Sequence, residues 1–411
     1  MSKNGTTCMP AEGGVCAAKG FRASGVHCGI RNNTEKKDLA LILSEVPCAA
    51  AAVYTKNLVK GAPLIVSKTH LADGRAQAIL CNSGNANTCN VDGEAVAEGM
   101  SALLAKAAGI PNEDVVVAST GVIGVPLPLA PIEAGIPDLV VQLSENGSND
   151  AAESIMTTDT KKKEVAVSFM LGGKECHIGG IAKGSGMIHP DLATMLVFLT
   201  SDVAIAPALL QQALTKDIDD SFNMVSIDCD TSTNDMVVLL ANGLAGNPTI
   251  TEENEDYEAF VAALHEVTLA LCRMIAADGE GATKFLACHV TGAKEKTAAR
   301  TIAKSVICSN LVKTAMFGAD ANWGRILCAI GYSGIETDVE AIDVAFRSAA
   351  GHIDVCKKGK GIPFSEESAK TILLEDKIEI LVTMQEGDAE ATAFGCDLTY
   401  DYVKINGDYR T

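Results

Sequence analysis

The sequence is short of basic residues, and this shortage narrows the possible partners. Lys and Arg number 33 against 52 Asp and Glu, which gives a formal net charge of −19, and the longest basic run covers only Lys161 to Lys163. Affinity for nucleic acids comes largely from clustered Lys and Arg. A nucleic-acid partner is therefore not expected, whereas an acidic protein is well suited to cationic small substrates.

Several short motifs of common enzymes are also missing. None of the seven His residues has the HExxH or HxxxH spacing that places two imidazoles on one helical face for a metal. There is no GxSxG elbow, no Walker lysine loop and no GxGxxG after a strand. We therefore expect neither a metal nor a nucleotide cofactor. His189 beside Pro190 could act as a base, but a His in a turn is more often solvated or capped.

The fourteen cysteines include no CxxC pair, so zinc ribbons and thioredoxin-like sites are excluded. Several lie in apolar runs, such as Cys288 in FLACHV and Cys328 in ILCAIG, where a reduced Cys behaves as a small hydrophobic residue. This pattern favours structural thiols in a reducing compartment. A non-enzymatic metal-binding protein is the alternative from another class, and the unpaired spacing disfavours it.

The N-terminus, MSKNGTTCMPAEGG, lacks a basic segment followed by an apolar core. No uninterrupted apolar run reaches the roughly 18 residues that a spanning helix requires. We therefore expect a cytoplasmic protein with no membrane partner.

The hydrophobic content of 47% in 411 residues is enough for a large core. EAVAEGMSALLAKAAG reads as a helix that stops at Gly109, and KEVAVSFMLGGKECHIGGIAKGSG reads as two strands around Gly172 and Gly173. Strands and helices do not alternate regularly, which favours a layered α/β or α+β fold over a Rossmann or barrel plan. Small polar clusters follow several strands, where sites are often built, but these clusters alone do not identify a reaction.

Eight short segments of the chain, taken in order, closely resemble motifs of the glutamate N-acetyltransferase or ornithine acetyltransferase family of arginine biosynthesis. They run from Asn82 to Thr411, almost the whole chain. They are NSGNAN (82–87), ASTGVIG (118–124), MTTDT (156–160), KGSGMIHPDLATML (183–196), DTSTND (230–235), EGATK (280–284), ANWGRI (321–326) and YVKINGDYRT (402–411).

The resemblance implies that the chain cleaves itself between Ala193 and Thr194. Residues 1–193 would become an α chain and residues 194–411 a β chain, folded together as an αββα sandwich like that of DmpA-like proteins. Two of each would form a heterotetramer. The freed α-amine of Thr194, with an unperturbed pKa near 8, would then serve as general base for its own hydroxyl.

The implied reaction is ping-pong acyl transfer through an acetyl-Thr194 intermediate. The acetyl group would pass from N2-acetyl-L-ornithine to L-glutamate, and acetyl-CoA is a further possible donor. Thr120 and Gly121 would form the oxyanion hole, and Ser119 is interpreted as a turn residue. No cofactor is implied. The substrate-binding residues carried over by the resemblance are Thr157, Lys183, Thr194, Glu280, Asn406 and Thr411.

The chain departs from the family pattern at two places. Asp191 and Leu192 stand where the family usually has Asn and Met, which could change the cleavage rate. Lys161 and Lys162 replace a usual Phe-Pro, which leaves the choice between Thr157 and Thr158 as the ligand open.

Two further questions stay open at this level. The residues do not show whether the enzyme uses acetyl-CoA as well, so bifunctional and monofunctional enzymes are both compatible with the sequence. A self-processing aminopeptidase of related fold is an alternative, disfavoured because that group uses a Ser nucleophile.

Overall fold

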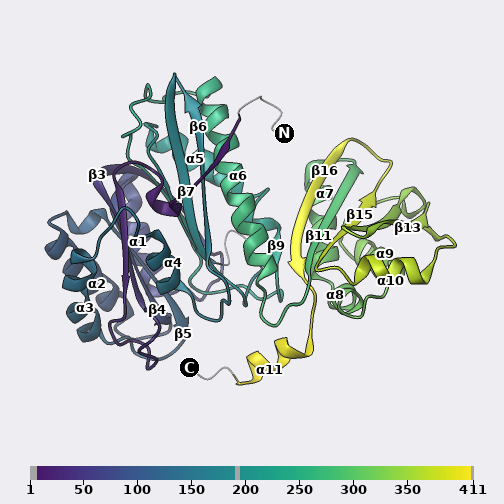
Figure 1. Cartoon of the computed structure of the whole chain (residues 1–411), viewed down its shortest axis with the longest axis horizontal. Coiled ribbons are helices and arrows are strands. Elements are labelled where there is room, and N and C mark those ends of the chain that lie inside the picture. The colour runs from purple at the N-terminus through teal and green to yellow at the C-terminus, as the bar shows by residue number, and fades with distance from the viewer. Residues whose placement is uncertain (1–6, 190–194, 409–411) are drawn as a thin grey trace.

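The computed structural model describes residues 7–189 and 195–408, which form two β-sheets with helices on their faces (Figure 1). The first sheet has nine strands in the order β1-β6-β7-β8-β10-β3-β4-β5, and β2 also pairs with β3. Its strands are β1 (Met9–Ala11), β2 (Phe21–Val26), β3 (Leu39–Tyr54), β4 (Arg75–Asn85), β5 (Val115–Val122), β6 (Lys163–Leu171), β7 (Lys174–Lys183), β8 (Leu196–Ser201) and β10 (Met236–Ala241). The helices packed on it are α1 (Ala62–His70), α2 (Gly93–Ala108), α3 (Leu129–Val141), α4 (Ser148–Ile155), α5 (Pro207–Ile218) and α6 (Glu255–Ala277).

The long strand β3 divides this sheet into two parts. Its pairing with β4 shifts register between Leu43 and Cys48, and Pro47 lies in that stretch. A proline cannot donate to the ladder and is found at edges and bulges. The first half of β3 pairs with β2 and the second half with β10. The sheet can therefore turn back on itself at this point.

Three hydrophobic cores show how the two parts of the sheet are stacked. One core includes Ile42 of β3, Val116 of β5 and Phe198 of β8, so it lies between the two parts. Leu199, the next residue of β8, faces the opposite side, where α5 and α6 cover the sheet. A third core lies between β4, β5 and helices α1, α2 and α3. The order helix, sheet, sheet, helix confirms the predicted αββα sandwich.

A second sheet of seven strands adds a further layer beyond α6, which the sandwich prediction did not include. Its order is β14-β13-β12-β15-β11-β16-β9. Phe394 and Cys396 of β16 join the core around α6, and Arg273 of α6 lies 5.6 Å from the centre of the Phe394 ring. The strands are β9 (Val225–Ser226), β11 (Phe285–Ala293), β12 (Asp343–Ser348), β13 (Gly351–Lys357), β14 (Lys360–Gly361), β15 (Lys377–Thr383) and β16 (Ala389–Cys396).

The other face of the second sheet packs on helices of the C-terminal part. These helices are α7 (Lys296–Cys308), α8 (Asn310–Phe317), α9 (Trp323–Gly331) and α10 (Glu366–Leu373). The last helix, α11 (Tyr400–Asp408), has no buried residue and runs from the second sheet back below the sandwich (Figure 1).

Local sequence signals identified several elements correctly. Helix α2 ends before Gly109, whose φ is 70°, and β6 and β7 form a hairpin around Gly172 and Gly173. TAARTIAKSVICSNLVKTAMFG, which has helical periodicity throughout, is divided into α7 and α8. The break is at Ser309, whose side chain accepts a hydrogen bond from Val312 N.

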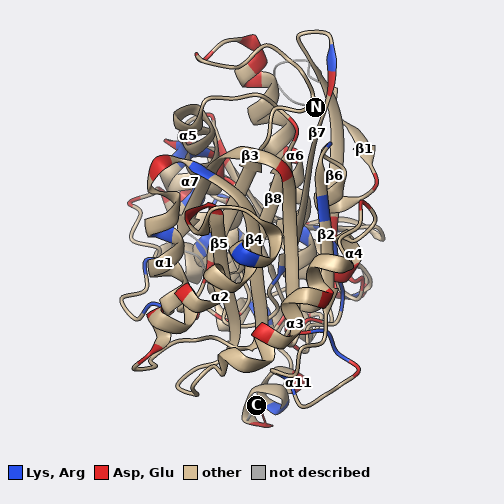
Figure 2. Ribbon diagram, turned by 90° about the vertical axis from the view of Figure 1, so that its left-hand side faces the viewer, with Lys and Arg blue, Asp and Glu red and all other residues tan. Residues whose placement is uncertain are grey.

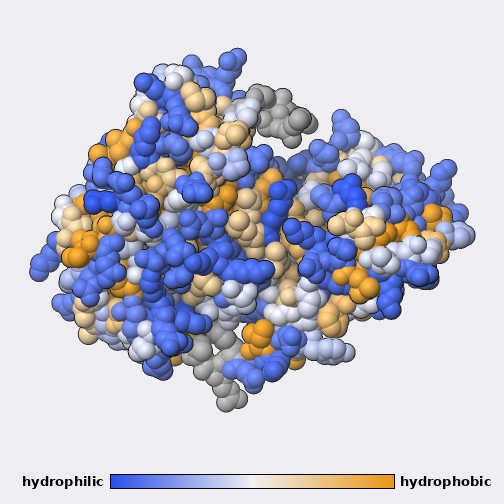
Figure 3. Space-filling view, viewed as in Figure 1, coloured by the Kyte–Doolittle hydropathy of each residue, from blue (hydrophilic) through white to orange (hydrophobic). Residues whose placement is uncertain are grey.

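Helix α6 is long and apolar enough to meet the length and composition criteria for a membrane span. It is nevertheless a core helix, because it contacts β6 and β7 of the first sheet and β16 of the second. Figure 2 shows Lys and Arg interspersed with Asp and Glu over the side that carries α1, α2 and α3. On the face in Figure 3 most residues are hydrophilic, and the hydrophobic ones form small separate groups.

Candidate active site

A pocket lies where the ends of β5 and β7 meet the start of β8. The predicted residues that line it come from five segments of the chain, and they are Thr120, Gly121, Thr157, Lys183, Glu280 and Asn406. Ala193, Thr194 and Thr411 lie outside the described residues, and so do Asp191 and Leu192. Met195, which follows the predicted nucleophile, also lines the pocket.

The end of β5 supplies Thr120 and Gly121. Gly121 has a φ of 136°, and a Cβ at this position would lie 2.3 Å from the carbonyl carbon of Gly84 on the neighbouring strand. Only glycine therefore fits here without displacement of the backbone. Ser119 is not a turn residue: it belongs to β5, is fully buried, and donates to Asn82 Oδ1 at 2.5 Å. Ser119 thus supports the strand from behind the pocket.

Lys183 ends β7 and faces the pocket, with a buried carboxylate behind it. Burial alone would raise the pKa of Asp159, but Lys183 and Lys163 lower that pKa to about 2. Asp159 also accepts a hydrogen bond from Gly184 N at 2.7 Å. A permanently ionised Asp159 therefore fixes the start of the loop that follows β7.

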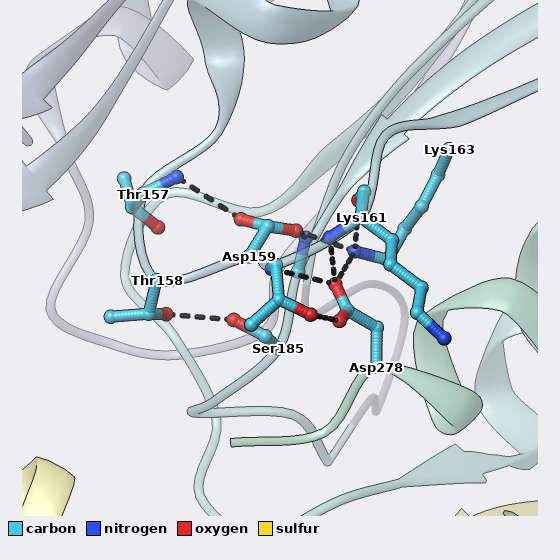
Figure 4. A network of polar contacts seen from close by, with 9 residues as sticks. Thr157, Thr158, Asp159, Lys161, Lys163, Ser185 and Asp278 are labelled. Atoms are coloured by element: carbon cyan, nitrogen blue, oxygen red, sulfur yellow. Dashed lines mark hydrogen bonds and ion pairs between the residues drawn. The ribbon is translucent and has the colours of Figure 1, made fainter. Parts of the chain in front are cut away.

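Thr157 and Thr158 both line the pocket, but their hydroxyls are used differently (Figure 4). The Thr158 hydroxyl lies 2.7 Å from the Ser185 hydroxyl. Within the described residues the Thr157 hydroxyl makes no hydrogen bond, although its backbone N–H donates to Asp159 Oδ2 at 3.0 Å. This difference favours Thr157 as the residue that contacts a ligand.

Glu280 and Asn406 join the loop after β7 to the C-terminal helix. Asn406 Nδ2 donates to Glu280 Oε2 at 2.7 Å, and Glu280 N donates to Ser185 O at 2.7 Å. Helix α11 is tied down again by Tyr402, whose hydroxyl donates to Asp228 Oδ2 at 3.2 Å. Because Asn406 lines the pocket, the C-terminal helix closes one side of it.

Asp235 is a pocket residue that the sequence reasoning did not single out, although it ends the DTSTND motif. It is fully buried, its Oδ2 has no hydrogen-bond partner within the described residues, and burial raises the pKa of its carboxyl well above the ordinary value. Ser232 and Lys183 oppose this effect only in part. The available signal was an acidic residue directly before the apolar strand MVVLLA.

Comparisons with known proteins place almost the whole chain in a family. A family model described as the ArgJ family matches residues 22–411. The chain is 51% identical over 392 residues to the arginine biosynthesis bifunctional protein ArgJ 1 of Clostridium acetobutylicum, covering 95% of this chain and 96% of that protein. It is 50% identical over 401 residues to the ArgJ protein of Symbiobacterium thermophilum, covering 97% and 99%. The crystal structure of an ArgJ protein from Bacillus halodurans is 48% identical, with a TM-score of 0.49, and covers 52% of this chain and 98% of that one.

Proposed function

Because the chain belongs to the ArgJ family, we propose that it is an acetyltransferase of arginine biosynthesis that moves an acetyl group from N2-acetyl-L-ornithine to L-glutamate. The products are L-ornithine and N-acetyl-L-glutamate. The observation that carries this proposal is the convergence of six predicted residues from five segments in one pocket beside Met195. We place the reaction in the cytoplasm.

In the first half-reaction, the Thr194 hydroxyl attacks the acetyl carbonyl of acetylornithine, and the Thr194 α-amine takes the hydroxyl proton. The tetrahedral intermediate carries an oxyanion, for which the Thr120 hydroxyl and the Gly121 amide are the donors. Collapse of this intermediate breaks the amide bond. The proton passes to the departing α-amine of ornithine, and the acetyl group remains as an ester on Thr194.

In the second half-reaction, the α-amine of glutamate attacks the ester, and the Thr194 hydroxyl is regenerated. Lys183 can pair with a substrate carboxylate, and its positive charge also favours the neutral form of the Thr194 amine. Glu280 can pair with the δ-ammonium of ornithine, and Asn406 holds this carboxylate in place. Thr157 and Thr411 complete the proposed binding set, and the chemistry requires no metal or organic cofactor.

We propose that Thr194 becomes a nucleophile with a free amine through self-cleavage. Its hydroxyl attacks the carbonyl of Ala193, the acyl group shifts from nitrogen to oxygen, and water hydrolyses the ester. The resulting chains, 1–193 and 194–411, would assemble as two copies of each. β7 and β8, which flank residues 190–194, pair in one sheet, so the fold can hold both products together after cleavage.

The intact mass of the purified protein, measured under denaturing and reducing conditions, tests this proposal together with the acetylornithine and glutamate assay. We expect two chains that separate between Ala193 and Thr194, no cleavage and no activity in Thr194→Ala, and residual cleavage in the matched variant Thr194→Ser. A single 42.7 kDa chain that still transfers acetyl would disprove the amine-assisted mechanism. Cleaved protein without acetyl transfer would disprove the proposed reaction.

The relatives carry the description bifunctional, and on that basis we propose that acetyl-CoA also serves as a donor for glutamate acetylation. The assay is glutamate acetylation with acetyl-CoA and no acetylornithine. Turnover abolished by Thr194→Ala is the expected result, and absence of turnover in the active wild-type enzyme would make it monofunctional.

A further inference from the structure

Three residues that are far apart in the sequence bring one nitrogen and two sulfur atoms together. His189 lies in the loop after β7, Cys229 is in the turn after β9, and Cys308 is the last residue of α7. Their ligand atoms all lie within 4.8 Å of one another. Among residues 7–189 and 195–408, this is the one group of three His, Cys, Asp or Glu side chains with that geometry.

The spacing of these atoms fits a tetrahedral metal ion. Zinc binds Cys sulfur at about 2.3 Å and His nitrogen at about 2.0–2.1 Å, so tetrahedral ligands of the two kinds lie about 3.6 Å apart. The distance from His189 Nδ1 to Cys308 Sγ is 3.4 Å. The three side chains are therefore close to the separations that a bound ion requires, without rearrangement of the backbone.

The two thiols also influence each other's pKa. A hydrogen bond from Cys308 is the main cause that lowers the pKa of Cys229, to about 4, and His189 acts in the same direction against burial. The pKa of Cys308 is raised, mainly by the neighbouring Cys229. The Cys229 sulfur also lies 3.4 Å from the backbone oxygen of Cys308, so the two cysteines are in direct contact in the fold.

The backbone at Cys229 is unusual for a non-glycine residue. Its φ is 69°, in the left-handed region that disfavours a Cβ. The Ser226 hydroxyl donates to Cys229 Sγ at 3.7 Å, and Cys229 is exposed, so an ion can reach the site from solvent. A thiol is thus held toward its partners by a turn in which glycine would be less strained.

We propose that His189 Nδ1, Cys229 Sγ and Cys308 Sγ bind one soft divalent cation of the Zn²⁺ type, with solvent as the fourth ligand. Binding forms two metal–sulfur bonds and one metal–nitrogen bond, and each thiol that carries a proton passes it to water. The ion joins the loop after β7 to helix α7, which packs on the second sheet. Gly186 and Met187 of this loop line the pocket. The role of the ion is to hold that loop, and it takes no part in acetyl transfer.

The sequence did not predict this metal site, because the expectation of no metal rested on patterns in which the ligands are close together in the sequence. The CxxC and HxxxH patterns find ligands that are neighbours on one turn or one helix. Here the ligand positions are 40 and 79 residues apart (229 − 189 and 308 − 229), and only the tertiary fold brings them together.

The test is titration of the full, reduced and metal-free protein with Co²⁺, followed by competition with Zn²⁺. We expect one Co²⁺ per chain, a thiolate-to-metal absorption band, its loss on addition of Zn²⁺, and tighter binding at higher pH. Cys229→Gly is the main variant, because glycine suits the φ of 69° and the fold should survive. It should weaken binding by more than the 10–100-fold typical of an outer-shell partner, as should Cys308→Ser.

The matched control is Cys328→Ser, which changes an exposed thiol of α9 outside the cluster and should leave binding unchanged. Zinc should raise the melting temperature of the wild type and of this control, but not of Cys229→Gly. A Co²⁺ stoichiometry near zero, or equal binding in Cys229→Gly, would overturn the proposal. A Cys229–Cys308 disulfide in protein purified without reductant that does not bind Zn²⁺ after reduction would overturn it as well.

Discussion

Lys163, Asp159 and Asp278 form a buried polar network next to the pocket. The network and the pocket differ in how completely their hydrogen-bonding groups are used. In the network, the Lys163 ammonium donates to Asp159 at 2.7 Å, to Asp278 at 2.6 Å and to Lys161 O at 3.3 Å (Figure 4). An ammonium has three donors, so all of them are satisfied. On the pocket side, the Lys183 ammonium makes no ion pair or hydrogen bond within the described residues, although its backbone belongs to β7.

The same contrast holds for the acidic residues of the two regions. Asp278 accepts from Thr160 N at 3.1 Å and from Lys161 N at 3.2 Å in addition to Lys163, whereas Asp235 Oδ2 in the pocket has no partner within the described part of the chain. A buried polar group left without a partner costs stability. The network therefore serves to hold the loops, and the pocket keeps its hydrogen-bonding capacity for a ligand.

The largest expected effect comes from breaking the network. Lys163→Met removes the ammonium that contacts both buried carboxylates, Asp159 and Asp278, and removal of one partner of a buried pair costs about 3–5 kcal/mol. Urea unfolding measures this loss. Lys162→Met is the matched control, because Lys162 is exposed and pairs with Glu153 at the surface, so its cost should stay below about 1 kcal/mol. Equal stability of the two variants would contradict the division between network and pocket.

The second prediction tests the pocket side. Thr120→Val removes one proposed oxyanion donor with almost no change of shape, so kcat should fall about 10²–10³-fold, or about 2.7–4 kcal/mol of barrier. Thr120→Ser retains the hydroxyl and should recover most of the rate. Steady-state kinetics in both half-reactions measure the effect, and urea unfolding should show little change. A loss of stability with unchanged kcat would instead show that Thr120 stabilises the fold and does not act on the substrate.

The smallest effect is expected at Asp235. Because its folded-state pKa is raised, the folded protein binds more protons than the unfolded chain, whose Asp has a pKa near 3.9. Wild-type stability from this group is full below about pH 3.9 and is lost as pH rises toward the folded pKa. Asp235→Asn removes that loss, so the variant should gain on the order of 1 kcal/mol relative to wild type by neutral pH. Thermal unfolding from pH 4 to pH 8 measures the difference.

Parallel stability curves for wild type and Asp235→Asn would contradict the raised pKa and indicate that Asp235 is ionised, with Lys183 as its counter-charge. Lys183→Met then separates the two cases. If Asp235 is neutral, the stability difference between Asp235 and its Asn variant changes with pH in the same way with or without Lys183. If Asp235 is ionised, Lys183→Met removes its counter-charge, and the protein becomes less stable as pH rises.

Motif resemblance predicted six of the residues that line the pocket, but it did not assign structural roles to their neighbours. Ser119 supports β5 through Asn82, although it stands next to the proposed oxyanion residues. The Thr158 hydroxyl is hydrogen-bonded to the Ser185 hydroxyl, whereas the Thr157 hydroxyl makes no hydrogen bond in the described part of the chain. Asp235 was missed because its significance depends on burial and on an absent partner. These properties depend on neighbours from distant segments, and a motif does not describe them.

The sequence by itself determined the local elements and the family. Positive φ at Gly109, Gly172 and Gly173 marks a helix end and a hairpin, because backbone conformation at such positions depends on the residue itself and its immediate neighbours. Only the tertiary structure decided which distant groups meet. Lys163 and Asp278 are 115 residues apart, and the pairing becomes possible once burial brings them into a region where an unpaired charge would be costly. The assembly of the pocket and of the His189, Cys229 and Cys308 cluster has the same physical origin.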